Sequence, residues 1–392
     1  MTSATALRRV VVCYGTRPEA IKLAPVVHAL SRHPSFEPVV VVTGQHRAML
    51  DQVNSLFDIT PDVDLDIHAA GQTLDEITSR VLTRLTPVLQ DRRPDAVLVQ
   101  GDTSSCFAAS LAAAYLQIPV FHLEAGLRTG NLANPFPEEL NRRLTGALAA
   151  LHMAPTPLNR ANLLREGVLA RAIVVTGNTV VDALHHVLAR GSEPKAKELL
   201  RLPAGRVILV TAHRRESLGE PMHLTAKAIA QLAAQYPEIT FVLPLHLNPR
   251  VREVVIPVLG DLPNVILLEP LDYRDLAWLL ERCSIVLTDS GGIQEEAPGL
   301  GKPVLVLRDT TERPEALTAG TVRLVGTDPE VIISQTRRLL DDPQAYEEMA
   351  RAVNPYGDGA AAARCVAAMA HYFGDAPAAQ EFVADVALTG AP

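Results

Sequence analysis

Acidic side chains stand directly after two apolar runs of this chain, where they could donate and accept protons. Asp102 comes just after Ala96–Gln100. Glu124 follows Val120–Leu123, and Glu138 starts a later helical stretch. A single acid at the end of a strand is often only a helix cap. Several acids beside a cationic pocket would instead be placed for general acid–base catalysis, with pKa values raised by burial and lowered by the cations.

Positively charged side chains follow two further apolar runs and could bind an anion such as a phosphate group. Arg17 and Lys22 lie at the start of a helix in which Pro18 takes an early position. His213 and Arg214 come directly after another apolar run. Arginine and lysine in such places can bind phosphate oxygens, although a surface helix start or loop with solvated cations would show the same residue types.

The segment Ser290-Gly291-Gly292-Ile293-Gln294-Glu295-Glu296 lies at a predicted turn from strand to helix. Its two glycines allow backbone N–H groups to approach an anion at the positive end of a helix, which suits a pyrophosphate. Glu296 lies one helical turn beyond Gly292, so its carboxylate could accept hydrogen bonds from ribose hydroxyls. A glycine-rich turn capped by Ser290 is the structural alternative.

Other nucleotide-binding and metal-binding motifs are missing from the sequence. No GxGxxG follows an apolar run, and Gly301-Lys302 is followed by Pro303 where a P-loop needs Ser or Thr. Asp62, Asp64 and Asp66 alternate as in some metal motifs, but we expect them on a solvent-facing edge, because no His or Cys cluster has metal-ligand spacing. We therefore expect neither a tightly bound dinucleotide nor a metal ion.

Alternating apolar and helical segments must position these side chains. Continuous apolar runs are typical of parallel strands buried on both faces, and their alternation with helices predicts right-handed βαβ units. The predicted strands of the first half are Val10–Tyr14, Val39–Thr43, Ala96–Gln100, Val120–Leu123 and Ile173–Thr176. The predicted helices there are Ala20–Leu30, Arg47–Leu56, Leu74–Gln90, Cys106–Tyr115 and Glu138–Ala149.

A polar stretch over residues 191–205 separates this pattern from a second one. The second set of predicted strands is Val207–Thr211, Phe241–Pro244, Val265–Leu268, Ile285–Thr288 and Val304–Leu307. The predicted helices are Leu224–Ala234, Asp275–Arg282, Glu330–Leu340 and Ala360–Phe373, with a tail over 377–392. Ligands of open α/β sheets bind beyond the carboxyl ends of strands. Because polar groups follow strands in both halves, we expect a cleft between two facing sheets.

Composition narrows the class of protein. The 392 residues suffice for about two domains, and 36 Lys and Arg against 44 Asp and Glu leave a net charge of −8. This charge argues against a nucleic-acid partner. The apolar run Val10–Tyr14 is too short for a signal-peptide core or a membrane span, so we expect a cytoplasmic protein with no membrane partner. Residues expected in the core, in a reducing compartment, are Cys13, Cys106, Cys283 and Cys365.

Long motifs in a single order give the chain a family resemblance. They run from about Val10 to about Phe373 and read GTRPEAIKLAPVV, GQHRAMLDQV, GDTSS, EAGLRTG, PEELNRRLTG, TGNTVVDAL, HRRES, HLNPRVRE, DSGGIQEEAPGLGKPVLVLRDTTERPEAL, AGTVRLVGT and NPYGDG. With these motifs the chain closely resembles the non-hydrolysing UDP-N-acetylglucosamine 2-epimerases of bacteria.

The resemblance implies the α/β GT-B architecture, in which two Rossmann-like domains face each other across a central cleft. The N-terminal domain would comprise residues 1–177, joined by the C-terminal helix at about 365–382, and the UDP-binding domain residues 178–364. A homodimer is also implied. The implied reaction converts UDP-GlcNAc reversibly to UDP-ManNAc through elimination of UDP, 2-acetamidoglucal and re-addition, and it supplies ManNAc-type sugars for cell-surface polysaccharide. This route needs no cofactor.

Matching motifs imply roles for individual residues. The acid–base groups would be Asp102, Glu124 and Glu138, and the groups around the diphosphate and sugar Arg17, Lys22 and His213. Lys22 and His213 are thereby catalytic candidates as well. The implied nucleotide-binding set is Ser290, Gly291, Gly292, Glu296 and Arg313, with Leu271 and Leu276 near the uracil.

The resemblance also implies regulation, because bacterial members bind a second UDP-GlcNAc that activates them. Matching motifs supply Gln45, Arg214 and His246 for this second site. Ala48 and Gly71 stand where some members have a Gln and an Arg. We therefore expect the activation to be retained but weaker.

Three other functions compete with this interpretation. The chain could be a 2-epimerase of a related UDP-2-acetamido or 2,3-diacetamido sugar. It could be a GT-B glycosyltransferase, which would need an open acceptor groove in the first domain. A catalytically silent UDP-sugar-binding regulator is the third alternative, and the acids and cations at all the matching positions argue against it.

Overall fold

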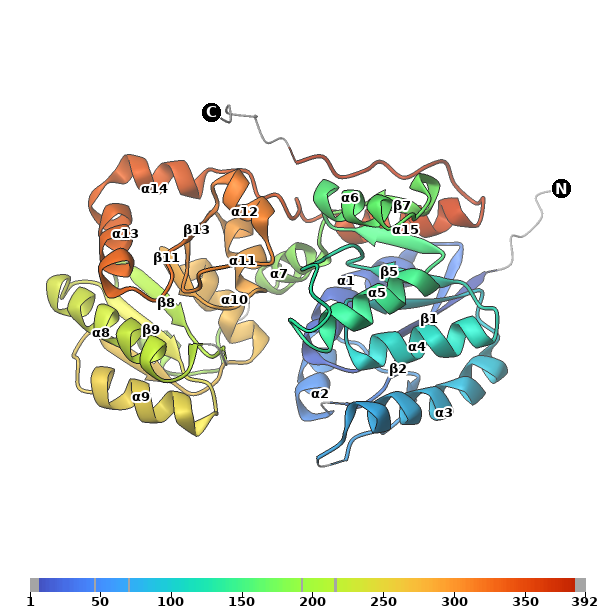
Figure 1. Ribbon diagram of the computed structural model, residues 1–392, viewed down its shortest axis with the longest axis horizontal. Helices are drawn as coiled ribbons and strands as arrows, with labels where there is room; N and C mark the ends of the chain where they lie inside the picture. Colours follow the sequence, from blue (N-terminus) through green and yellow to red (C-terminus); the bar gives the residue numbers. More distant parts are fainter. Residues whose placement is uncertain (1–6, 46, 70, 192, 215–216, 385–392) are drawn as a thin grey trace. The chain divides into compact units, whose positions relative to one another are not determined.

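The computed structural model describes residues 7–45, 47–69, 71–191, 193–214 and 217–384. Over these residues the chain forms two compact units, each an α/β layered structure (Figure 1). Unit 1 comprises the residues up to His186 together with Tyr356–Val383, and unit 2 comprises Val187–Pro355. Each unit is described by itself below.

Unit 1 extends further along the chain than the expected residue 177. Helix α7 (Thr179–Ala189) carries Asp182, which is buried and accepts hydrogen bonds from the N–H groups of Ala361 and Ala362 at 3.2 and 2.8 Å. These bonds fix α7 to the start of the last helix, α15 (Ala361–Tyr372). Most of α7 and the segment before α15 therefore belong to unit 1.

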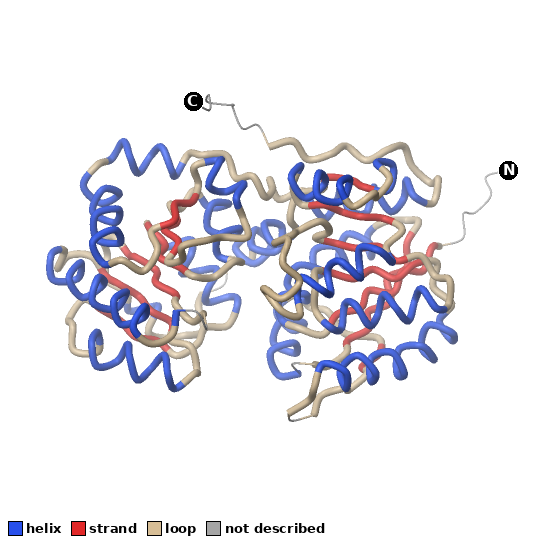
Figure 2. The backbone as a smooth tube through the Cα atoms, in the orientation of Figure 1, coloured by secondary structure: helices blue, strands red, loops and turns tan. Residues whose placement is uncertain are grey.

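The described residues of unit 1 form a seven-stranded parallel sheet in the order β3-β2-β1-β4-β5-β6-β7, with helices around the strands (Figure 2). The strands are β1 (Arg8–Tyr14), β2 (Phe36–Val42), β3 (Val63–Asp64), β4 (Ala96–Gln100), β5 (Val120–Leu123), β6 (Leu151–Ala154) and β7 (Ile173–Val175). Besides α7 and α15, the helices are α1 (Arg17–Arg32), α2 (Arg47–Leu56), α3 (Leu74–Arg92), α4 (Ser104–Tyr115), α5 (Glu138–Leu148) and α6 (Pro157–Arg165), with the 3₁₀ turn η1 (Ala170–Ala172).

Unit 2 repeats this plan, and its described residues form a six-stranded parallel sheet in the order β10-β9-β8-β11-β12-β13. The strands are β8 (Val207–Thr211), β9 (Thr240–Pro244), β10 (Val265–Leu268), β11 (Ile285–Thr288), β12 (Val304–Val306) and β13 (Val322–Leu324). The helices are α8 (Glu220–Gln235), α9 (Pro249–Leu259), α10 (Tyr273–Arg282), α11 (Ile293–Glu296), α12 (Pro314–Ala319), α13 (Pro329–Asp341) and α14 (Pro343–Ala350), with the 3₁₀ segments η2 (Leu199–Arg201) and η4 (Ala297–Leu300).

The apolar runs of the sequence form the cores of both sheets, as predicted. In unit 1, Val11 of β1 pairs with Val39 on one side and Val97 on the other, and its side chain is fully buried. Burial of one such side chain stabilises the fold by about 1.5–3 kcal/mol. The four cysteines are buried and free, and burial raises the pKa of the Cys283 and Cys365 thiols to about 12. Their prediction as core residues is confirmed.

The expected tail over 377–392 is wrong for the part that the structure describes. Phe382 is buried, and its N–H donates a 2.8 Å hydrogen bond to the carbonyl of Val175 in β7. Arg160 pairs with Glu381 at 2.7 Å. The sequence of this segment shows no helical or strand periodicity, because the segment forms neither a helix nor a strand. It packs on unit 1 through two side chains and one backbone hydrogen bond.

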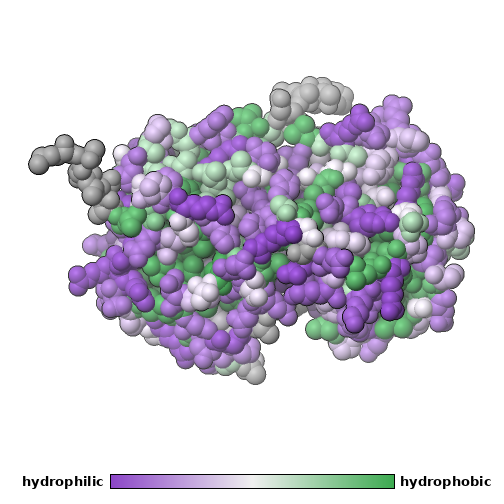
Figure 3. Space-filling view, turned by 180° about the vertical axis from the view of Figure 1, so that it is seen from behind, coloured by the Kyte–Doolittle hydropathy of each residue, from purple (hydrophilic) through white to green (hydrophobic). Residues whose placement is uncertain are grey.

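The surface seen in Figure 3 mixes hydrophilic with hydrophobic side chains. Among the helices of the described residues, none is long and apolar enough to cross a membrane.

Candidate functional site

The loops after β4 and β5 bring two predicted acids to the carboxyl ends of adjacent strands. Glu124 comes directly after β5 and adopts a left-handed backbone with φ +62°. Such a conformation costs a non-glycine residue about 1 kcal/mol or more, and it recurs at functional sites. The carboxylate of Glu124 contacts Lys22 Nζ and Gln100 Nε2, and it accepts a hydrogen bond from Asn178 Nδ2 at 3.1 Å. Two predicted site residues, Lys22 and Glu124, are therefore in direct contact.

Asp102 is held by an arginine that the sequence reasoning missed. Arg142 of α5 donates from Nε to Asp102 Oδ2 at 3.1 Å, and its Nη1 donates to Glu139 Oε2 at 3.2 Å. The Arg142 side chain is only 4% exposed. Asn141 of the same helix bonds the Asp102 carbonyl at 3.0 Å. The motif containing Arg142 was recognised, but only the fold shows that its guanidinium reaches the loop after β4.

Neighbouring glutamates at the start of α5 have different environments. Glu139 is fully buried and accepts hydrogen bonds from the N–H groups of Thr129 and Gly130 at 3.0 and 3.2 Å. Burial alone would raise the pKa of Glu139, but these N–H groups and the charge of Arg142 outweigh it and lower the pKa. Glu138 is half-buried at the first residue of the helix. Glu139 therefore has a structural role, and Glu138 is the candidate for proton transfer.

A buried carboxylate links the loop after β1 to the loop after β4. Glu19 accepts hydrogen bonds from Gly15 N and Thr16 N at 3.0 and 2.8 Å, and from Thr103 Oγ1 at 2.6 Å. Burial raises the pKa of Glu19. Arg17, half-buried at the start of α1, is thereby fixed relative to the Asp102 loop. The sequence reasoning missed Glu19, because an acid three residues into a helix also occurs in ordinary capping boxes.

In unit 2, a second missed carboxylate orients the predicted histidine. Asp289, fully buried after β11, accepts hydrogen bonds from His213 N and Arg214 N, both at 2.7 Å. Its Oδ1 lies 3.2 Å from Nδ1 of His213. Burial would raise the pKa of Asp289, but the contacts with His213 and Arg214 outweigh it and lower the pKa. The imidazoles of His213 and His246 stack with centroids 5.6 Å apart.

The predicted nucleotide-binding residues also gather in unit 2. The guanidinium of Arg313 packs against Gly291, where an added Cβ would lie 2.6 Å from Nη1. Arg313 Nε donates to Glu295 Oε1 at 2.7 Å. Glu296 accepts a 2.8 Å hydrogen bond from Tyr273 Oη, a partner that sequence reasoning missed. Ser290, Gly291, Gly292, Glu296 and Arg313 therefore share one corner of the unit.

The helix after the glycine pair is shorter than expected. Helix α11 has four residues and continues as the 3₁₀ segment η4. Gly292 is its N-cap and no side chain caps it, so the alternative of a Ser290 cap is wrong. A four-residue helix carries little of the macrodipole of a long one. Backbone N–H groups and Arg313 must therefore carry most of any anion binding here.

The other predicted residues lie on both units. Leu271 and Leu276 are half-buried at and near the start of α10. Gln45, in unit 1, accepts a 2.9 Å hydrogen bond from Ser105 Oγ. Arg214 and His246 belong to unit 2 and both adjoin His213. Residue 46 and residues 215–216 of the matched motifs lie outside the described residues, as does the side chain of Ala48.

The aspartates at 62, 64 and 66 do not form a metal site. Asp62 accepts a hydrogen bond from Val40 N at 2.7 Å, while Asp64 and Asp66 each pair with Arg47 at 2.7 Å. Asp64 lies on β3, one of the two edge strands of this sheet. In the part of the chain that the structure describes, no group of three or more His, Cys, Asp or Glu could hold a metal ion.

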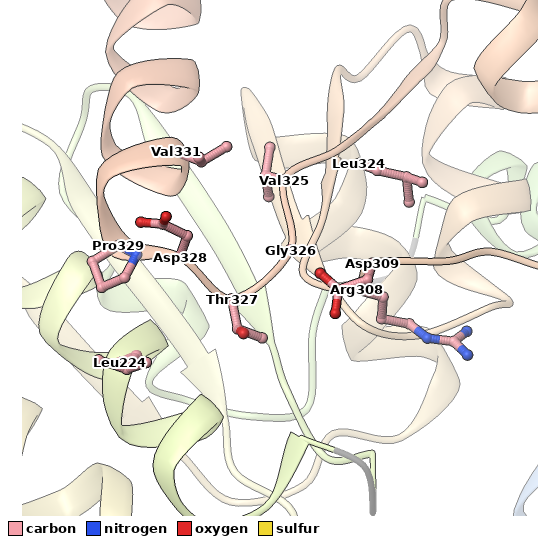
Figure 4. A pocket seen from close by; sticks show the side chains of 10 residues that line it. All are labelled: Leu224, Arg308, Asp309, Leu324, Val325, Gly326, Thr327, Asp328, Pro329 and Val331. Atoms are coloured by element: carbon pink, nitrogen blue, oxygen red, sulfur yellow. The ribbon is translucent and has the colours of Figure 1, made fainter.

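A separate pocket of unit 2 has a volume of about 730 Å³ and lies after β12 and β13 (Figure 4). Asp309 and Gly326 adjoin each other there, and a Cβ on Gly326, which has φ +61°, would lie 2.7 Å from Asp309 Oδ1. The left-handed backbone and the close approach of Asp309 both favour glycine at this position. None of the predicted nucleotide-binding residues is among those that line this pocket.

Comparison with known proteins identifies the family of the chain. A family model described as UDP-N-acetylglucosamine 2-epimerase matches residues 28–370. The UDP-N-acetylglucosamine 2-epimerase of Salmonella typhimurium is 55% identical over 371 residues, which cover 93% of this chain and 99% of the relative.

Solved structures agree with this relationship. The crystal structure of UDP-GlcNAc 2-epimerase from Neisseria meningitidis, bound to UDP-GlcNAc, is 50% identical with a TM-score of 0.87, covering 93% of this chain and 100% of that one. A putative UDP-N-acetylglucosamine 2-epimerase from Listeria monocytogenes is 48% identical with a TM-score of 0.90, covering 96% and 100%. These similarities confirm the predicted GT-B class of two Rossmann-like domains.

Proposed function

The chain belongs to the UDP-N-acetylglucosamine 2-epimerase family of isomerases, and from this premise we propose that it interconverts UDP-GlcNAc and UDP-ManNAc by elimination and re-addition of UDP. The substrate follows from the relatives, since the Neisseria meningitidis enzyme was crystallised with UDP-GlcNAc. The chain has Lys22 and Glu124 in contact, next to the Asp102–Arg142 pair. This pairing of acids with cations at adjacent strand ends supports the chemistry most directly.

The elimination begins with the C1–O bond, because no carbonyl group acidifies the proton on C2. The electron pair of that bond leaves with UDP, a carboxylate takes the proton from C2, and a C1=C2 double bond forms in 2-acetamidoglucal. Re-addition of a proton to the opposite face of C2 and of UDP to C1 completes the inversion. The step needs positioned acids and bases and a stabilised departing diphosphate.

In unit 1, Asp102, Glu124 and Glu138 are the proton carriers. Lys22 forms an ion pair with Glu124 and Arg142 one with Asp102, and these contacts hold the two carboxylates in place. Glu138 is spared the structural contacts that its neighbour Glu139 makes. Arg17 and Lys22 supply positive charge for the diphosphate.

In unit 2, the corner around Gly291 binds the UDP. Glu296, which is oriented by Tyr273, accepts hydrogen bonds from the ribose hydroxyls. We assign Ser290, Gly291, Gly292 and Arg313, which packs against Gly291, to the diphosphate. We assign His213, whose ring contacts Asp289, to the region of the diphosphate and sugar. Leu271 and Leu276 enclose the uracil.

We further propose a homodimer in which a second UDP-GlcNAc, bound by Gln45, Arg214 and His246, activates the enzyme. Helices α4 and α5 pack against each other in unit 1 and expose Tyr115 (71%) and Leu144 (39%). Large apolar side chains on neighbouring helices suit a subunit contact. The product would supply ManNAc-type sugars for cell-surface polysaccharide.

Proton NMR of the purified protein with UDP-GlcNAc tests the reaction. The appearance of UDP-ManNAc signals, in a ratio that is the same when the reaction starts from UDP-ManNAc, is the expected result. An unchanged spectrum, together with turnover of a UDP-2,3-diacetamido sugar, would assign the chain to that related substrate instead. Transfer of the sugar to an added acceptor would indicate a glycosyltransferase.

A further inference from the structure

The turn at Gly101 is held from both sides by strand β5. Gly101 follows β4 and has φ +71°, a left-handed conformation. Its N–H donates to the carbonyl of Leu123 at 3.0 Å, and its own carbonyl accepts a 2.7 Å hydrogen bond from Nε2 of His122. Both backbone polar groups of this residue are thus bonded to β5, the strand that directly precedes Glu124.

The ring of His122 is a permanent donor to this carbonyl. Its side chain is fully buried, and burial lowers the pKa of His122 to about 3, so the imidazole is neutral at any working pH. A carbonyl oxygen can only accept, which fixes the proton on Nε2. Within the described residues, Nδ1 is buried without a hydrogen-bond partner. The bond to Gly101 is therefore the polar contact that the imidazole makes.

In the sequence, Gly101 lies between Gln100, which contacts one candidate acid, and Asp102, which is the other. On one side, Gln100 contacts the Glu124 carboxylate through Nε2. On the other side is Asp102 itself, paired with Arg142. A rotation of the Gly101 peptide would move Asp102 relative to Glu124. Misplacement of catalytic groups by about 1 Å can lower a rate roughly a hundredfold.

We propose that His122 is a positioning residue, which sets the spacing of Asp102 and Glu124 by holding the Gly101 carbonyl. The role rests on the proposed function, in which both acids carry protons. His122 does not touch the substrate in this scheme, and it transfers no proton. Its contribution is to keep one backbone turn in a single conformation.

The neighbouring strand offers a matched control. His152 of β6 is the register partner of His122 and is 2% exposed. Burial also lowers its pKa, to about 4. The ring of His152 is buried like that of His122. Among the hydrogen bonds of the described residues, however, only His122 contributes a ring donor to the Gly101 carbonyl. Loss of His152 should therefore disturb the core without moving the acids.

Three variants separate the two roles. In His122→Gln, the amide Nε2 lies as many bonds from the backbone as the imidazole Nε2 and can still donate. In His122→Met, the chain has a similar length but no donor, so the Gly101 carbonyl loses its partner. His152→Met is the control. We expect His122→Met to lower kcat roughly ten- to a hundredfold with KM nearly unchanged, while the other two variants stay within about threefold of the wild type.

Amide hydrogen exchange over residues 100–103 gives a readout that does not depend on activity. Exchange should be faster in His122→Met than in the wild type, and unchanged in His122→Gln and His152→Met. Equal kcat and equal exchange in the Gln and Met variants would overturn the positioning role, as would an equal loss of kcat in His152→Met. A wild-type protein that leaves UDP-GlcNAc unchanged would instead refute the proposed function, and the exchange data would still decide whether His122 holds the turn.

Discussion

Lys22 and Glu124, which lie 102 residues apart in the sequence, form an ion pair at the carboxyl end of the unit 1 sheet. Because the pair places a carboxylate with a cationic partner among the other candidate groups, Glu124→Gln should lower kcat by roughly a hundredfold or more while UDP still binds. Turnover is followed by proton NMR and UDP binding by calorimetry. Glu37→Gln, which removes an ion pair with Arg9 near the opposite end of the sheet, is the control and should keep normal turnover.

Turnover in heavy water should place deuterium at C2 of the sugar. Elimination releases the C2 proton to a carboxylate that exchanges with solvent, and re-addition then delivers a deuteron. Mass spectrometry of both UDP-sugars after many turnovers measures this incorporation. Product without deuterium at C2 would rule out the elimination route, and added NAD should leave the rate unchanged.

The adjacent glutamates of α5 should respond differently to amide substitution. Glu138→Gln should reduce kcat by roughly a hundredfold with an unchanged melting temperature. Glu139→Gln should lower the free energy of unfolding by about 2–3 kcal/mol, because it weakens a fully buried acceptor of two backbone N–H groups and its pairing with Arg142. Kinetics and thermal melts on both proteins check this. Near-normal turnover in Glu138→Gln would remove that residue from the catalytic set.

Removal of the Tyr273 hydroxyl should weaken UDP binding. The hydroxyl donates to Glu296 at 2.8 Å and orients the carboxylate that we assign to the ribose. Tyr273→Phe should raise the Kd for UDP roughly fivefold, and Glu296→Gln should raise it further, since one hydrogen bond contributes about 1 kcal/mol. Tyr236→Phe, which removes an exposed hydroxyl bonded to Asp341 in the same unit, serves as the control in calorimetry. Equal affinities in all three variants would contradict the assignment.

The stability of the protein should fall below neutral pH partly because of His152. Burial, aided by the charge of Arg128, lowers the pKa of His152 to about 4 from an ordinary value of about 6.5. Folding thus favours the neutral ring, so this contribution to stability is full above pH 6.5 and is lost as the pH falls toward 4. His152→Met should flatten the pH dependence of the unfolding free energy in that window, by up to about 1.4 kcal/mol per pH unit. Denaturant titrations at pH 7, 6 and 5 measure the slope, and identical slopes would be the contrary result.

Activation by a second UDP-GlcNAc should appear in the reverse reaction. With UDP-ManNAc as the sole substrate we expect a lag, which a trace of UDP-GlcNAc abolishes, because that ligand favours the active state. Gln45→Ala and His246→Ala should lengthen the lag. Hyperbolic progress without a lag, unchanged in both variants, would show that this chain lacks the second site.

Strands were predictable from sequence where a run is apolar throughout. Ala96–Gln100 and Val207–Thr211 were predicted with the bounds that the structure shows. Strand β6 was missed because it follows helix α5 after only Ala149 and Ala150, with no polar turn to separate the two apolar segments. Strand β13 was missed because it has three residues and Arg323 interrupts them. Each strand contains a polar residue, His152 in β6 and Arg323 in β13, which the sheet accepts for reasons that only tertiary packing supplies.

The positions of the candidate acids Asp102 and Glu124 at the ends of strands were predictable, because their motifs follow apolar runs. The partners that orient them were not. Glu19, Arg142 and Asp289 act through contacts with distant backbone N–H groups and side chains, such as the bond from Thr103 to Glu19 across 84 residues. No local spacing encodes such a contact, so it becomes visible only when the strands are in register.

The segment that ends at Phe382 covers the outer edge of β7, the last strand of the unit 1 sheet. An open edge strand pairs readily with other chains and promotes aggregation. Removal of residues from 381 onward would therefore expose the backbone of Val175 and favour pairing of β7 with an edge strand of another molecule. In the intact protein the same segment keeps the free side of Val175 from pairing with a strand of another molecule.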